Sequence, residues 1–225
     1  MISIHARLGA VALTLSLASA LPAQSPADAA IDKAVAAYKG MKSAKASFEQ
    51  TITNPLTGSS VSSKGEFEQR QPGTFVFRFT EPKGDMIVGD GKTLWVFLPS
   101  TNPGQVIRSP LDKSGAGSLD LTGQFFNAPR TRYTIADGGT ATVSGQQTRA
   151  LKLEPKHDGE PFAHATVWVD TDDGTLRQFE TIDGSGVKRL VRVTSFQPNV
   201  AVSAEAVRFS PPKGVRIVDQ EALRR

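Results

Sequence analysis

Hydrophobic and polar residues alternate along most of this chain, in short runs separated by turn signals. The clearest run, Thr74–Thr80, reads TFVFRFT. In an extended strand this order places Phe75, Phe77 and Phe79 on one face. The run therefore predicts a β-strand with an aromatic face.

Turn dipeptides divide the sequence into many such runs. Pro72-Gly73, Asp90-Gly91 and Asp137-Gly138-Gly139 are typical of connections between antiparallel strands. The predicted strands are 46–53, 61–70, 74–80, 85–88, 93–98, 105–108, 132–135, 140–143, 149–154, 162–169, 176–182 and 187–196, with short pieces near Val207 and Val215. So many sequential strands predict a mainly β protein, a large antiparallel sheet curled into a barrel or half-barrel.

One helix is predicted ahead of the strands. Ser25-Pro26-Ala27-Asp28 has the order of a helix start, with Ser as cap and Pro in the first turn. Ile31, Val35 and Tyr38 fall on one apolar stripe of a helix that ends near Gly40.

A second break in the strand pattern is the segment Ser109–Asn127. Leu119, Leu121 and Phe125 lie there among Gly and Ser residues, which predicts one or two short helices. We expect these helices and the first one to cap one mouth of the curled sheet, as a lid.

The N-terminus has the features of a signal peptide. Arg7 supplies positive charge, residues 8–17 are apolar or small, and small residues precede cleavage sites near Ala20 or Ala23. The apolar run is shorter than the ~20 residues of a membrane-spanning helix. We expect residues 1–23 to be removed on export and residues 24–225 to form a single soluble domain.

Composition excludes several function classes. The chain has no cysteine, so it has no disulfide, no thiol nucleophile and no lipid-bearing N-terminal Cys. Its formal net charge is +4, with both signs interspersed. The densest basic cluster is Lys188, Arg189 and Arg192, which we interpret as a solvent-exposed strand face. Nucleic-acid binding is not expected.

No constellation of catalytic or metal-binding residues is evident. The three histidines are predicted to lie in the leader (His5), in a turn (His157) and in a strand (His164), so a metal site of two or three histidines is not expected. Asp170–Gly174 lacks the distal Glu of a calcium loop and is better explained as a hairpin turn. We expect no catalytic residue, no metal and no cofactor.

An excess of aromatic residues remains, and it has two interpretations. On pattern alone, aromatic stripes are most often an ordinary packed core. A single curled sheet with only small helices for cover would instead leave part of its concave face unfilled, and such a hollow suits a lipid. For that second interpretation the cavity residues are Phe48, Phe67, Phe75, Phe77, Phe79, Trp95 and Phe97.

The order of these features resembles the outer-membrane lipoprotein carrier family, LolA. The resemblance is strongest in GDGKTLWVF and recurs in VDTDDGTLRQFETIDGSGVKRLVRVTSF and FSPPKGVRIVD. It implies an unclosed antiparallel barrel with a helical lid over an apolar cavity. It also implies a periplasmic, non-enzymatic and monomeric chaperone that accepts lipoproteins from an inner-membrane ATP-driven (ABC transporter) releasing complex and delivers them to a receptor in the outer membrane or to that membrane itself.

The resemblance also points to a lid latch. Family members carry an Arg directly before the Pro of the Pro-Gly turn, where this chain has Gln71, with Arg70 one residue earlier. A shift of one residue in a strand reverses the facing of a side chain. Both residues are therefore latch candidates.

Two other function classes remain as alternatives. A periplasmic domain of similar fold could sense lipoproteins and regulate a membrane partner, although such sensors usually carry a second domain. A hydrolase of hydrophobic substrates would need a nucleophile and a base, and the sequence offers no such pair.

Overall fold

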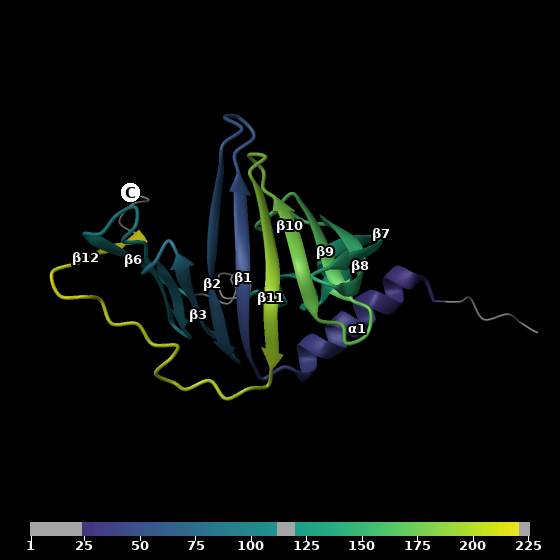
Figure 1. Cartoon of the computed structure of the whole chain (residues 1–225), viewed down its shortest axis with the longest axis horizontal. Helices are drawn as coiled ribbons and strands as arrows, with labels where there is room; N and C mark the ends of the chain where they lie inside the picture. Colours follow the sequence, from purple (N-terminus) through teal and green to yellow (C-terminus); the bar gives the residue numbers. More distant parts are fainter. Residues whose placement is uncertain (1–23, 112–119, 221–225) are drawn as a thin grey trace, which may run out of the picture.

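The computed structural model describes residues 24–111 and 120–220. Most of these residues belong to one twelve-stranded sheet (Figure 1). The predicted signal peptide and the predicted lid residue Leu119 lie outside the described residues. No helix among the described residues is long and apolar enough to span a membrane.

The strands form an open sheet in the order β12-β6-β5-β4-β3-β2-β1-β11-β10-β9-β8-β7. Neighbouring strands are antiparallel, except that β12 runs parallel to β6. This confirms the predicted mainly β, unclosed antiparallel architecture. The strands are β1 (Ser43–Thr53), β2 (Ser60–Arg70), β3 (Thr74–Glu81), β4 (Met86–Asp90), β5 (Thr93–Phe97), β6 (Gln105–Pro110), β7 (Tyr133–Val143), β8 (Gln146–Pro155), β9 (His164–Asp170), β10 (Leu176–Ile182), β11 (Lys188–Pro198) and β12 (Arg216–Asp219).

Helix α1 (Pro26–Gly40) begins where the sequence predicts it. Ser25 is the N-cap, and its Oγ accepts a hydrogen bond of 3.1 Å from the Asp28 backbone N–H. The helix crosses one end of the sheet and contacts β7, β8 and β9 (Figure 1). Two helices of one turn each, α3 (Gly123–Phe126) and α4 (Pro129–Arg132), precede β7.

One predicted turn is wrong. Asp137-Gly138-Gly139 does not end a strand, because β7 continues through it with a shift of register against β8. Asp137 Oδ1 accepts a hydrogen bond of 2.8 Å from the Gly139 backbone N–H, and Gly139 has φ +86°. Aspartate and glycine here form a β-bulge, which uses the same residue types as a turn.

The two faces of the sheet bury different clusters. The inner face packs under α1 and α3 and holds most of the hydrophobic core. The outer face of β3 and β4 carries Val76 and Val88, which pack against Val202 and Val207. The latter two belong to the long segment that connects β11 to β12, drawn in yellow in Figure 1. Val207, predicted near a short strand, therefore lies in a turn that covers the outer face.

Candidate functional site

Phenylalanine rings from three neighbouring strands gather on the inner face. The Phe77 ring lies 4.6 Å from that of Phe67, 5.8 Å from Phe48 and 5.9 Å from Phe75, measured between centroids. Phe79 is partly exposed and lies 5.7 Å from Phe48. The structure thus brings together five of the seven aromatic residues predicted to line a cavity.

Two glycines make room for these rings. A Cβ on Gly65 would lie 2.9 Å from Cζ of Phe48, and one on Gly89 would lie 2.4 Å from Cε1 of Phe75. Real Cβ atoms do not approach so closely, so only glycine fits under each ring. Gly89 therefore allows the ring of Phe75 to pack on the inner face.

Trp95 and Phe97 do not join this cluster. Trp95 pairs with Val88 across β4 and β5, and Val88 faces outward, so Trp95 does too. Both rings pack against Phe209, at 5.5 and 6.0 Å. Leu94 of β5, which the aromatic pattern did not select, packs against the inner-face cluster instead.

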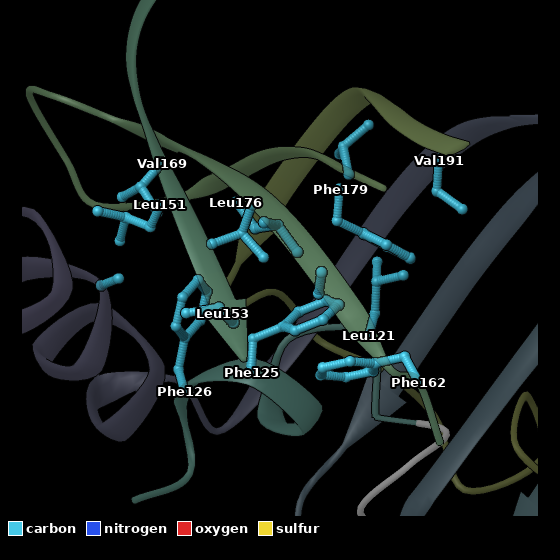
Figure 2. Close-up of a cluster of buried hydrophobic side chains, with 14 of the residues drawn as sticks. Leu121, Phe125, Phe126, Leu151, Leu153, Phe162, Val169, Leu176, Phe179 and Val191 are labelled. Carbon is cyan, nitrogen blue, oxygen red and sulfur yellow. The ribbon is translucent and has the colours of Figure 1, made fainter. Parts of the chain in front are cut away.

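A second group of rings fills the inner face beneath α3 (Figure 2). Phe125 of α3 lies 5.0 Å from Phe179 of β10 and 5.8 Å from Phe162. Leu121 is also buried here, at 2% exposure. The sequence pattern predicts Phe125 and Leu121 as lid residues but does not select Phe162 or Phe179, although both lie within predicted strands.

Helix α1 places its apolar stripe over the same core. Ile31 is fully buried, and Val35 and Tyr38 pack against the cluster while partly exposed. The Tyr38 hydroxyl donates a hydrogen bond of 3.2 Å to Asp120, whose carboxylate also accepts from the Gly123 backbone N–H at 3.0 Å. Burial, with the nearby Asp120 carboxylate, raises the pKa of Tyr38 to about 12. This contact joins α1 to α3.

Exposed polar contacts hold the rest of α1 in place. Arg130 of α4 pairs with Asp28 at 3.0 Å and also with Asp32. Hydrogen bonds from Ser25 and Arg130 lower the pKa of Asp28. Lys33 Nζ donates to the backbone carbonyl of Thr171 in the β9–β10 turn. Exposed ion pairs of this kind contribute only ~0–1 kcal/mol each.

An apolar pocket of about 260 Å³ lies between the C-terminal half of α1 and the sheet. Its lining includes Ala37 and Tyr38 of α1, Phe126 of α3, Leu176 of β10 and Phe196 of β11. Helices α1 and α3 therefore leave part of the space beside the inner face unfilled.

The two latch candidates lie apart from the described helices. Arg70 lines a hollow of the outer side together with Asp90 and Phe209. The Gln71 backbone N–H donates to the Lys42 carbonyl at 2.9 Å, and its side chain is exposed. Among the described residues, neither side chain forms a hydrogen bond with α1 or α3, so a latch role for either stays a prediction.

Ionisable residues do not gather into a metal centre in the part of the chain that the structure describes, where no group of three or more His, Asp or Glu could hold an ion.

Comparison with known proteins decides the family. Residues 39–210 match the family described as outer membrane lipoprotein carrier protein LolA. The chain belongs to the LolA family. A relative described as outer-membrane lipoprotein carrier protein, from Serratia proteamaculans (strain 568), is 31% identical over 175 residues, which cover 78% of this chain and 80% of that protein.

Solved structures resemble this chain at low sequence identity. An uncharacterized conserved protein from Thermus thermophilus superposes with a TM-score of 0.54 at 15% identity, over 85% of this chain and 97% of that one. A LolA superfamily protein from Nitrosomonas europaea gives a TM-score of 0.41 at 14% identity, over 81% and 97% of the two chains. At 15% identity, the likeness to the Thermus thermophilus protein concerns the fold alone.

Membership of the LolA family fixes the broad function. The protein is an outer-membrane lipoprotein carrier, which shuttles lipoproteins to the outer membrane and is not an enzyme. Carriers of this family act in the periplasm.

Proposed function

We propose that this carrier shields the acyl chains of its cargo between the inner face of the sheet and the cover formed by α1 and α3. The observation that carries the proposal is the gathering of Phe48, Phe67, Phe75, Phe77 and Phe79 on that one face. The rings would contact the acyl chains, and α1 would move aside to admit them.

The energetics of transfer favour a cover of this kind. Each methylene withdrawn from water contributes ~0.8 kcal/mol, so one long acyl chain resists crossing water by roughly 10 kcal/mol. A carrier must offset that cost and still release its cargo. Because the polar contacts of α1 with Arg130 and Thr171 are exposed, they would break at little cost when α1 opens.

The proposed partners and compartment are those that suit a lipoprotein carrier. The chain would receive lipoproteins from an ATP-driven releasing complex of the inner membrane and pass them to a receptor in the outer membrane, or to that membrane directly. The predicted signal peptide, residues 1–23, supports export to the periplasm. Residues 24–225 would then act as a single carrier domain.

The experiment compares two partly exposed aromatic residues on opposite faces of the sheet. Phe79→Ala removes a ring from the proposed site, whereas Phe97→Ala removes one from the outer face. We expect Phe79→Ala to weaken binding of a diacylated lipopeptide and to slow lipoprotein transfer to acceptor vesicles. Phe97→Ala should leave both unchanged. Equal binding by the wild type and Phe79→Ala would place the site elsewhere.

A further inference from the structure

Arg189 faces the inner side of the sheet, close to the end where the β1–β2 and β10–β11 hairpins turn. We call this the open end of the inner face. Arg189 of β11 pairs with Ile52 of β1, and its inward neighbour along the strand is Val191, which is buried. The guanidinium lies 5.7 Å from the ring centroid of Phe179. Arg189 thus differs from the exposed Lys188 and Arg192, and the interpretation of all three as a solvent-exposed face is wrong for Arg189.

Buried polar side chains position this guanidinium. Nε of Arg189 donates a hydrogen bond of 2.6 Å to Oε1 of Gln50, and Nε2 of Gln50 donates one of 3.1 Å to Oγ of Ser63. Gln50 is 9% exposed and Ser63 is 7% exposed. This chain of hydrogen bonds occupies Nε of Arg189 and leaves its two terminal nitrogens to other acceptors.

Those terminal nitrogens have no acidic partner among the described residues. The nearest acid along β10, Glu180, forms its ion pair with Lys188 at 3.1 Å. Burial lowers the pKa of Arg189 to about 10, so the group remains charged at neutral pH. A charge that is partly withdrawn from water is costly unless an opposite charge compensates it.

The surroundings suit an amphiphile. At the level of Arg189, its cross-strand partner Ile52 is 37% exposed, and Val61, which pairs with Ile52, is 68% exposed. This end of the inner face is therefore open to solvent. The tips of hairpins β1–β2 and β10–β11 lie side by side at this end (Figure 1). In the other direction the inner face continues to the rings of Phe48 and Phe179.

We propose that Arg189, positioned by Gln50, binds the anionic oxygen head, a carboxylate or a phosphate, of an acyl amphiphile whose chain lies against Phe48 and Phe179. The two terminal nitrogens would hold two oxygens of the head side by side, the geometry in which guanidinium groups bind such anions most strongly. The inference rests on the proposed function, because it takes the inner face as the acyl site. It adds a head-group preference at the open end.

The test measures binding of three ligands with one chain length to the wild-type protein by calorimetry: laurate, dodecyl phosphate and dodecanol. Acetate and inorganic phosphate serve as anions without a chain. We expect laurate and dodecyl phosphate to bind about 10- to 100-fold more tightly than dodecanol, as a charged hydrogen bond would provide. Acetate and inorganic phosphate should not bind measurably.

Two variants assign the preference to one residue. Arg189→Met should bind all three dodecyl ligands equally, whereas Arg192→Met, which removes an exposed arginine of the same strand, should keep the preference. Equal affinities in the wild type, or a preference that survives Arg189→Met, would overturn the head-group site while leaving acyl binding intact. If no dodecyl ligand bound the wild type, the acyl site itself would be refuted.

Discussion

Gly89 of β4 lies directly beneath the ring of Phe75, its cross-strand partner on β3. A Cβ at Gly89 would lie 2.4 Å from Cε1 of that ring. The packing of Phe75 on the inner face therefore requires glycine, which has no side chain, at position 89.

Gly89→Ala should displace the Phe75 ring. Overpacking of this kind costs ~1–3 kcal/mol of unfolding free energy, which urea denaturation will measure. Gly104→Ala is the control, because no described atom lies within 4 Å of a Cβ built at Gly104. Equal unfolding free energies for the two variants would contradict the account of this contact.

The two tyrosines of the chain should lose their hydroxyl protons at a higher pH than exposed tyrosines do. Tyr38 has its pKa raised to about 12 from 10.0, and burial also raises the pKa of Tyr133. Ultraviolet absorbance should therefore detect little phenolate at pH 10, where an exposed tyrosine is half ionised. Between pH 10 and 12 the unfolded chain loses the Tyr38 proton that the folded chain keeps. The stabilising effect of burying neutral Tyr38 is thus complete below pH 10 and is lost as the pH rises through 12. A phenolate midpoint near pH 10 for both tyrosines would show that neither is buried in solution.

The buried side chain of Gln69 should lower the free energy of unfolding, relative to an apolar side chain at the same position. Its side chain is 3% exposed, and its Nε2 has no hydrogen-bond partner among the described residues. Gln69→Met should raise the unfolding free energy by about 1 kcal/mol, since a buried amide without a partner is destabilising. Gln50→Met should lower it in the same assay, because Gln50 is bonded to Arg189 and Ser63. A loss of stability in Gln69→Met would mean that the amide has a partner in solution.

The latch prediction concerns the turn between β2 and β3. A neutral donor at position 71 forms hydrogen bonds roughly half as strong as those of a charged donor. Gln71→Arg should therefore favour the closed cover and slow the loading or transfer of a lipoprotein. Arg70→Leu should change transfer little, because Arg70 lines the outer side. A severe loss with Arg70→Leu and none with Gln71→Arg would identify Arg70 as the latch.

The sequence is sufficient for features that local chemistry determines. The cap at Ser25, the start of α1 and the inward facing of Phe75, Phe77 and Phe79 follow from short-range patterns, and the structure confirms them. Family resemblance supplies the open sheet, because the order of strands carries information that no single strand holds.

The remaining features depend on distant partners. The aromatic pattern assigns Trp95 to the inner face because aromatic residues suggest burial, but the facing of β5 is set by its register with β4. The ring that packs against Trp95 is that of Phe209, which lies far along the chain. Arg189 shows the opposite error: its charge suggests exposure, although it alternates with Val191 and Val193 on a buried face. The alternation of side chains along each strand predicts which face a residue occupies. The chemical type of Trp95 and of Arg189 suggested the wrong face.

The proposed function requires that cargo acyl chains contact the inner face of the sheet. Photo-crosslinking tests it most directly, with p-benzoylphenylalanine in place of Phe79 or of Phe97 and a lipoprotein carrying radiolabelled acyl chains. We expect the label to become attached to the protein substituted at Phe79 and not to the one substituted at Phe97. Attachment through position 97 and none through position 79 would contradict it.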